Sequence, residues 1–370
     1  MNILVLTTRN IYDESGEKTL MLSKDRVLRK NGVKLFYYSL RRKFDKDTRL
    51  FNIIKQDSMY DLIFKKEIIK KNLSQIIVEN KIDIIVVSGN WLLFLYSQLN
   101  KLKQKYNVKV SYDYQGAVEE VKEYKLFKDN QVLSNILFSI LHYYEKKFIS
   151  ITDGVEAVSQ NGIDYLKEMY GINFKDVIVH CGIEYPTPND MYDQYRKEWR
   201  EKYNLQDNDI ACVYAGGIAK WQNIDEIIEK AKNNHNIKLY IYTSPKNQVS
   251  IKKDYQLSNN IYFDFLSHEE LQQALCAFDY GFLLRNDDIT NFVAFPNKYS
   301  DYVNARLKIV LKNKKIGFYP KDESRQSILL TLDDTLTNEK QISNGIYSDY
   351  IEYLSYDNMI VYLINYYKDL

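Results

Sequence analysis

The sequence of 370 residues is short of cysteine and of long apolar runs, and it has no surplus of either charge. Its three cysteines, Cys181, Cys212 and Cys276, lie far apart and show no paired spacing, which excludes a disulfide framework and a structural zinc site. No stretch has the uninterrupted apolar length of a membrane span. The 51 basic and 49 acidic residues nearly cancel, so net charge gives no reason to expect nucleic-acid binding.

The N-terminus also lacks the features of a signal peptide. Its apolar stretch over 3–8 is short and has no basic leader, so it is better interpreted as a first strand. Together with the unpaired cysteines, this predicts a reducing, cytoplasmic location. No Gly-x-Gly-x-x-Gly follows that strand, which argues against a dehydrogenase.

Strand-like and helical patterns alternate along the chain. The first strand is followed by a helical pattern over 17–30 and a strand over 33–39, and this βαβ unit implies a parallel sheet. A chain of this length exceeds what one hydrophobic core usually organises. We therefore expect an α/β protein with two doubly wound, Rossmann-like domains facing across a cleft, where the carboxyl ends of their strands bind ligands.

Proline places the boundary between these domains. Only five prolines occur, and two of them lie in the segment 183–190, which we interpret as a linker. The sequence thus predicts an N-terminal domain over 1–183 and a second domain over 184–346, followed by one C-terminal helix over 347–370.

One stretch, 284–303, joins a strand, a polar loop and a helix start. The fixed φ of Pro296 suits the first turn of a helix that carries Lys298 and Asp301. Free N–H groups and the positive end of the helix dipole favour an anion there, and Lys298 adds a cation. Asp301 lies on the same helical face and can accept hydrogen bonds from sugar hydroxyls. An ion pair between these two residues at a solvated helix start would explain them equally well.

A second stretch, 214–223, runs from a strand through Gly216 and Gly217 to Lys220, just before a helix. The glycines allow the backbone to approach a ligand closely. A simple glycine turn with an exposed lysine is the alternative. Lys220, Arg285 and Lys298 together would neutralise two phosphates, so we expect no metal and no other cofactor.

The first half of the chain offers an acidic segment. Asp113 ends a strand and is followed by Glu119 and Glu120, which would bind acceptor hydroxyls, while Asp113 would serve as a general base if the reaction inverted. A solvated acidic loop explains these residues as well. Gly16, which opens the first helix, either admits a substrate or forms an ordinary turn.

Several of these residues carry a resemblance to a known family. Asn291, Pro296-Asn297-Lys298 and Asp301-Tyr302, preceded by Arg285, resemble the nucleotide-sugar signature of GT-B glycosyltransferases, in particular the large retaining family with capsule, O-antigen and exopolysaccharide transferases. The chain differs from that family at Asp301, where glutamate is usual. It also differs over 304–310, where the family has small residues and Gly-Pro-Val.

The resemblance implies a role for each part of the chain. The domain over 1–183 would be on the acceptor side, and the domain over 184–346 would bind the nucleotide sugar. Gly216, Gly217 and Lys220 would grip the donor's phosphates, Gly16 would border a substrate, and the C-terminal helix would pack back toward the first domain. Donor contacts would come from Asn291, Pro296, Asn297 and Asp301, and acceptor contacts from Glu119 and Glu120. The catalytic residues would be Lys220, Arg285, Lys298 and Asp113.

The predicted function is transfer of a sugar from a nucleotide diphosphate to a hydroxyl of a glycan or lipid-linked glycan. Retention follows only from the resemblance. One alternative is a sugar-nucleotide epimerase, which would need carboxylates and a histidine poised in the cleft. Another is an inactive nucleotide-sugar-binding partner protein.

Contact with an anionic membrane is a further hypothesis. Basic residues at 41–43, 65–66 and 70–71, with the apolar face of a helix over 131–149, suggest it. A solvated lysine-rich helix beside an ordinary core helix explains the same residues, and we favour that explanation.

Overall fold

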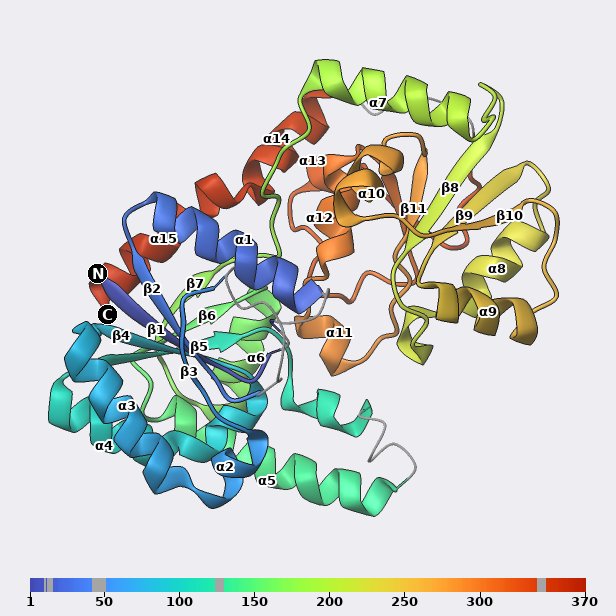
Figure 1. Ribbon diagram of the computed structural model, residues 1–370. Helices are drawn as coiled ribbons and strands as arrows, with labels where there is room; N and C mark the ends of the chain where they lie inside the picture. The colour runs from blue at the N-terminus through green and yellow to red at the C-terminus, as the bar shows by residue number, and fades with distance from the viewer. Residues whose placement is uncertain (10, 12–15, 42–50, 124–129, 338–343) are drawn as a thin grey trace. The chain divides into compact units, whose positions relative to one another are not determined.

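The computed structural model describes residues 1–9, 11, 16–41, 51–123, 130–337 and 344–370. Its contacts divide the chain into two compact α/β units (Figure 1). Unit 1 consists of Met1–Gly182, Phe292–Phe295 and Tyr356–Leu370, and unit 2 of Ile183–Asn291 and Pro296–Ser355. Each unit is built on one parallel sheet, as the alternating sequence pattern predicts.

Unit 1 has a seven-stranded sheet in the order β3-β2-β1-β4-β5-β6-β7. Every recorded pairing is parallel, and the central strand β1 pairs with β2 and β4. The strands are β1 (Asn2–Thr7), β2 (Lys34–Ser39), β3 (Ile53–Gln56), β4 (Ile84–Ser88), β5 (Lys109–Tyr114), β6 (Gly154–Ala157) and β7 (Lys175–Ile178). β4 is buried along its whole length, and β1 and β5 are buried from their second residue on, which is typical of a parallel sheet covered on both faces.

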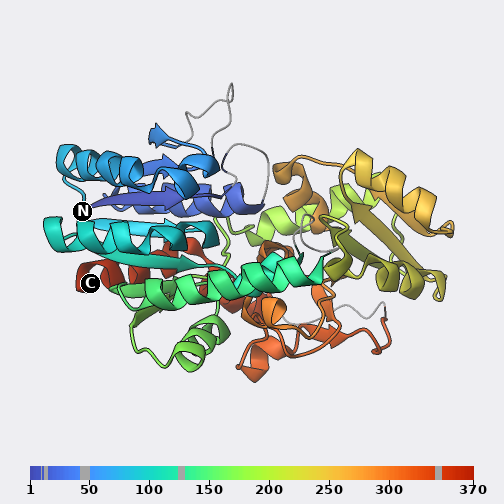
Figure 2. The same cartoon turned by 90° about the horizontal axis from the view of Figure 1, so that it is seen from below.

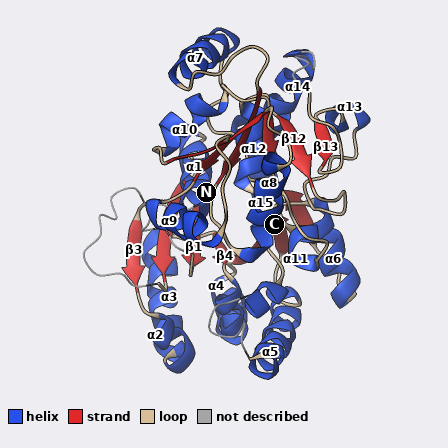
Figure 3. Cartoon of the chain, turned by 90° about the vertical axis from the view of Figure 1, so that its right-hand side faces the viewer, coloured by secondary structure: helices blue, strands red, loops and turns tan. Residues whose placement is uncertain are grey.

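The helices of unit 1 cover both faces of this sheet. They are α1 (Gly16–Lys30), α2 (Met59–Phe64), α3 (Lys66–Asn80), α4 (Tyr96–Tyr106), α5 (Gln131–Ile149), α6 (Gln160–Tyr170) and α15 (Tyr356–Asp369), with 3-10 turns η1 (Asn90–Leu95) and η2 (Val118–Glu123). Figure 3 shows α1 and α15 on one side of the strands and α3, α4 and α5 on the other. The Tyr367 hydroxyl donates to Glu156 Oε1 over 2.8 Å and fixes α15 to β6.

Unit 2 has a six-stranded parallel sheet in the order β10-β9-β8-β11-β12-β13. The strands are β8 (Ile210–Ala215), β9 (Ile237–Tyr242), β10 (Ile261–Asp264), β11 (Tyr280–Phe282), β12 (Lys308–Leu311) and β13 (Leu329–Thr331). Around them lie α7 (Asn189–Lys202), η3 (Lys220–Gln222), α8 (Ile224–Lys232), α9 (Pro245–Asp254), α10 (His268–Leu275), α12 (Asn297–Asn304), α13 (Glu323–Gln326) and α14 (Asn344–Leu354). α11 (Ile289–Val293) begins in unit 2 and ends in unit 1.

Four helices of this part were not expected from the sequence: α7, α9, α11 and α13. α11 lies inside the stretch predicted as a polar loop, where the Asp288 carboxylate accepts from the Asn291 amide N–H at 2.9 Å. The single C-terminal helix predicted over 347–370 is wrong, because the structure has α14 in unit 2 and α15 in unit 1. The break falls at Ser355, which forms a parallel bridge with Ile183.

A close contact inside unit 2 fixes α12 against the sheet. The Tyr302 hydroxyl accepts a hydrogen bond from the Ala215 N–H at 3.1 Å, and its ring lies directly over Gly281 of β11. A Cβ at Gly281 would stand 2.5 Å from the Tyr302 ring. The glycine is therefore needed to let the helix that carries Lys298 reach the ends of β8 and β11.

Gly281→Ala should lower the free energy of unfolding by about 1–3 kcal/mol, the usual cost of forcing extra atoms into a filled core. Urea unfolding measures this. Gly217→Ala is the matched control, because a Cβ there meets no atom within 4 Å. Equal stabilities of the two variants would contradict this account of how α12 is held.

Candidate functional site

Lys298 is held by two polar side chains at the carboxyl ends of the strands of unit 2. It lies in the first turn of α12, for which Pro296 is the N-cap. Its ammonium donates to the Tyr214 hydroxyl at 3.0 Å and to Gln222 Oε1 at 2.9 Å. It also lies 4.2 Å from the centroid of the Tyr214 ring. β8 and the η3 turn thus fix the position of this cation.

Gly216 makes room for that position. Its φ of +139° is one that side chains rarely adopt, and a Cβ would stand 2.5 Å from Lys298 Cε. The predicted close approach at the glycine pair is therefore an approach of Lys298 to the backbone. Gly217 differs: its carbonyl accepts a hydrogen bond from the Tyr214 hydroxyl, and the space beside its Cα is open.

The charges around Lys298 are not balanced. Burial lowers the pKa of the Lys298 ammonium well below its usual value, and the nearby Arg285 guanidinium lowers it further. Burial also lowers the pKa of Arg285, which follows β11. Within the described part of the chain, neither cation forms an ion pair with a carboxylate. Such a pair of cations is destabilising in the empty protein and would be stabilised by a bound anion.

Asp301 does not neutralise Lys298 through an ion pair. Its Oδ1 accepts a hydrogen bond from Gln272 Nε2 of α10 at 2.7 Å. Burial raises the pKa of Asp301, although His268, the Gln272 hydrogen bond and Lys298 favour its charged form. The alternative of a Lys298–Asp301 pair at a solvated helix start is therefore wrong. The carboxylate instead lies one helical turn beyond the cation, held in place by α10.

The remaining residues predicted to bind the donor have different surroundings. Asn291 is buried, and its side-chain amide donates to Asp288 Oδ2 at 2.9 Å. Asn297 is the first residue of α12. Lys220 opens η3 and is exposed, two residues before the Gln222 that holds Lys298.

Four residues of unit 1 were predicted to take part in the site: three lie at the end of β5 or in η2, and Gly16 lies on α1. Asp113 Oδ2 accepts from Ser88 Oγ at 2.6 Å and from Gln115 Nε2 at 2.7 Å, while Lys24 lies 3.8 Å from Oδ1. Glu119 accepts from the Tyr165 hydroxyl at 2.5 Å. Glu120 is partly exposed in η2, and Gly16 is the first residue of α1. The structure brings Asp113 together with polar partners but does not test the roles predicted for these four residues.

Arg306 lies in the turn after α12, within the segment 304–310 that differs from the glycine-containing segment of the resembled family. Its φ is +57°, in the left-handed region that glycine favours, so the turn after α12 keeps a glycine-type backbone without glycine. The guanidinium donates to Asn189 Oδ1 at 2.6 Å and lies 4.1 Å from the Tyr192 ring. These contacts, both with α7, explain how a strained arginine is tolerated at this turn.

Tyr214, Gln222 and Gln272 contact predicted site residues but were not themselves predicted from the sequence. Tyr214 belongs to an apolar strand, and its sequence position alone predicts a core residue. Only the Gly-Gly that follows Tyr214 could have suggested that its hydroxyl lies near a binding site. Nothing in the sequence places Gln272 beside Asp301, since 29 positions separate them.

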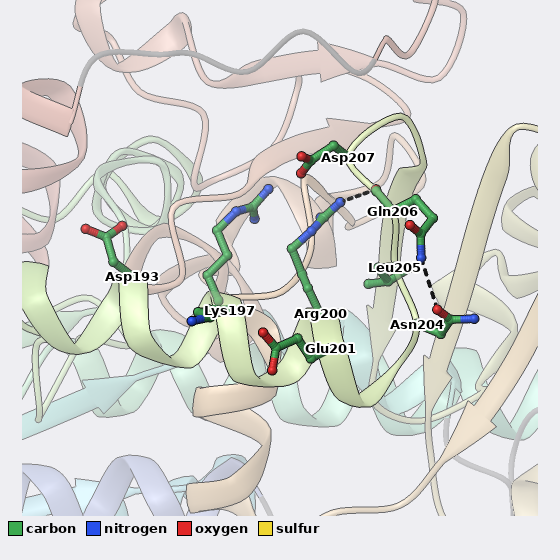
Figure 4. A pocket seen from close by; sticks show the side chains of 9 residues that line it. Asp193, Lys197, Arg200, Glu201, Asn204, Leu205, Gln206 and Asp207 are labelled. Atoms are coloured by element: carbon green, nitrogen blue, oxygen red, sulfur yellow. Dashed lines mark hydrogen bonds between the residues drawn. The ribbon is translucent and has the colours of Figure 1, made fainter.

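Unit 2 also has a hollow of about 560 Å³ on α7 and the turn after it, shown in Figure 4. Arg200, which lines it, is already satisfied: it donates to the Ala277 carbonyl at 2.9 Å and to the Gln206 carbonyl at 2.6 Å. The lining also contains three acidic and three basic side chains, so no net charge would attract an anion. None of the residues that hold Lys298 lines it, and we assign the hollow no role.

Two findings concern metals and membranes. Among the described residues, no three histidine, cysteine, aspartate or glutamate side chains gather as they would around a metal ion. In the same part of the chain, no helix combines the length and apolar character needed to cross a bilayer.

Comparison with known proteins identifies the fold. No protein-family model matches the sequence, and no curated protein matches it in a sequence search. Solved structures do match over the whole chain. A sucrose-phosphate synthase from Thermosynechococcus elongatus aligns with a TM-score of 0.69 at 10% identity, covering 100% of this chain and 98% of its own.

A glycosyltransferase from Rickettsia africae aligns with a TM-score of 0.68 at 14% identity, covering 100% of this chain and 98% of its own. The fold is GT-B. The trehalose-6-phosphate synthase of E. coli, bound with UDP-2-fluoro glucose, has the same GT-B architecture and aligns with a TM-score of 0.63 at 13% identity, covering 100% and 99%. The resemblance found in the sequence, which predicted two Rossmann-like domains, is therefore confirmed for the fold.

Lys298→Met should raise the free energy of unfolding at pH 7, because it removes a buried cation that has no carboxylate partner. The pKa of Lys298 is lowered in the folded protein, so the unfolded chain binds more protons below the ordinary lysine pKa of about 10.4. The gain is therefore fully present below the lowered pKa of the folded protein, and it is lost as the pH rises from there to the ordinary value.

Urea unfolding of both proteins at pH 7 and near pH 10 measures the difference. Lys253→Met is the control, because Lys253 is exposed in the last turn of α9. A stability difference between wild type and Lys298→Met that does not change with pH would contradict the buried-cation interpretation.

Proposed function

We propose that this chain is a glycosyltransferase that moves a sugar from a nucleoside diphosphate to a hydroxyl of a glycan or lipid-linked glycan. The observation that carries the proposal is the pair of cations, Lys298 and Arg285, held near the first turn of α12 without a carboxylate partner. A diphosphate placed there would supply the missing negative charge and meet the free N–H groups of the helix.

The residues of this site would act on the leaving group. When the bond between the anomeric carbon and the phosphate oxygen breaks, negative charge builds on the departing nucleoside diphosphate. The acceptor oxygen forms the new bond to carbon, and its proton leaves with the products. Lys298, already fixed by Tyr214 and Gln222, would stabilise that charge without having to reorganise, which lowers the barrier. No metal is needed for this step, and Lys220 would add a third cation.

Asp301 would bind hydroxyls of the donor. Its carboxylate lies on the same helix as Lys298 and is oriented by Gln272, so it accepts from the donor's sugar or ribose while the diphosphate lies against the cation. A nucleotide-sugar donor is also supported by the UDP-2-fluoro glucose in the E. coli relative in fold. Retention of configuration remains a prediction from the family resemblance, and the cytoplasmic location remains a prediction from the cysteines and the N-terminal sequence.

The acceptor would be bound by three carboxylates of unit 1, those of Asp113, Glu119 and Glu120. The Asp113 carboxylate is fixed by Ser88 and Gln115 at the end of β5, where parallel sheets bind their ligands. Only its Oδ1, near Lys24, is not already taken by these two hydrogen bonds. An acceptor hydroxyl could donate to that oxygen.

Calorimetric titration with UDP, GDP and ADP sugars tests the donor site. One donor should bind, and Lys298→Ala should weaken it by about tenfold to a hundredfold, because a hydrogen bond to a charged group contributes about 1.5–3 kcal/mol. Gly216→Ala should weaken it as well, since the added Cβ displaces Lys298. Lys253→Ala, at the far end of α9, should bind like the wild type.

The products then separate the candidate functions. Slow hydrolysis of the donor or transfer to an added glycan supports the transferase. An epimerised sugar nucleotide would identify an epimerase, and binding without turnover would identify a binding protein. Failure of every nucleotide diphosphate to bind, or equal affinities of wild type and Lys298→Ala, would overturn the proposal.

A further inference from the structure

An apolar stripe runs along the solvent side of α5. Val132, Ile136, Ile140 and Tyr143 follow one another at spacings of four, four and three, so they lie on one face of the helix. Their side chains are between 41% and 69% exposed. Isolated exposed apolar residues are common, but a continuous stripe of large ones is not.

This stripe is separate from the face by which α5 joins the core. The buried residues of α5 are Ser134, Leu141, Glu145, Phe148 and Ile149, on the opposite side. Glu145 fixes that face, since it accepts from the hydroxyls of Tyr112 at 2.9 Å and Tyr170 at 2.6 Å. The hypothesis of an ordinary core helix is therefore wrong for the first half of α5, which has a second apolar face that the core does not use.

A second exposed apolar group lies on α2 and the start of α3. Tyr60, Ile63, Phe64 and Ile68 are between 46% and 68% exposed. Figures 1 and 3 both show α2 and α5 at the same end of unit 1, and Figure 2, seen from below, shows α5 at the front.

Aromatic rings of η1 connect the two groups. Phe94 lies 4.7 Å from the ring of Tyr144 on α5, and the Lys66 ammonium at the start of α3 lies 5.4 Å from Phe94 and 5.7 Å from Tyr144. We call the whole area, formed by residues 60–71, 94 and 132–147, the α2–α5 surface.

Lysines surround this apolar area. Residues 59–71 contain four lysines and two acids, and the acids are engaged: Asp61 pairs with Lys65 at 2.8 Å and Glu67 with Lys70 at 2.8 Å. Four lysines of the α2–α5 surface form no ion pair with any described residue: Lys66, Lys71, Lys146 and Lys147. Of the other basic residues first considered, Arg41 is exposed, while 42 and 43 lie outside the described residues.

We propose that the α2–α5 surface docks on a lipid bilayer with anionic headgroups. A helix with large apolar side chains on one face and lysines beside it lies in the plane of such an interface, with aromatic rings at headgroup level. The flexible lysine stems allow the ammonium groups to reach the phosphates while the apolar side chains enter the acyl boundary. This docking is peripheral and does not depend on the donor site.

Vesicle co-sedimentation tests the surface with the full chain and no sugar nucleotide. Vesicles of phosphatidylcholine with phosphatidylglycerol should bind the wild type, and phosphatidylcholine alone should bind it at least about tenfold less, with binding falling as salt rises. Ile136→Asp/Ile140→Asp should weaken binding by about tenfold or more. Lys71→Glu/Lys147→Glu should weaken it only on anionic vesicles. Val249→Asp, at an exposed position of α9 in unit 2, is the control.

Thermal unfolding and UDP binding of each variant show that it is folded, which separates failure of this proposal from failure of the donor site. Lack of binding to anionic vesicles at low salt would overturn it, as would equal binding by wild type and both double variants. A dimer in solution that Ile136→Asp/Ile140→Asp abolishes, without any vesicle binding, would assign the surface to a second copy of the chain instead.

Discussion

The candidate site of unit 2 depends on two cations, Lys298 and Arg285, which the folded chain holds near one another without a carboxylate partner. Burial and mutual repulsion both disfavour the charge on Lys298, so the empty site is destabilising. Proteins keep such arrangements where a ligand restores the balance, and stability is commonly sacrificed at binding sites. We propose a diphosphate as that ligand, because its negative charge and its preference for helix N-termini suit the two cations and the first turn of α12.

The rest of unit 2 serves to bring these groups together. Parallel pairing places the ends of β8 and β11 side by side, so Tyr214 and Arg285 are neighbours although 71 positions separate them. Gly281 lets Tyr302 lock α12 onto the sheet, and Gly216 leaves room for the lysine. Both glycines are thus explained by close approach, one of a helix and one of a single side chain.

Much of the fold could be predicted, because apolar strands and helical periodicity alternate regularly and each short-range pattern has one physical cause. Lys298 and Gly216 were found because helix starts and glycine pairs have recognisable sequence signals. Tyr214, Gln222 and Gln272 were not, since their roles arise only from tertiary contacts. The exposed stripe on α5 shows the same limit: periodicity reveals an apolar face but does not tell whether the core covers it.

The most direct test of the central claim is a crystal structure of the chain with a tightly bound nucleoside diphosphate. The account predicts that the phosphates lie at the first turn of α12 and contact Lys298 and Arg285. Phosphates bound elsewhere, or a Lys298 that keeps its present partners and touches no phosphate, would contradict it.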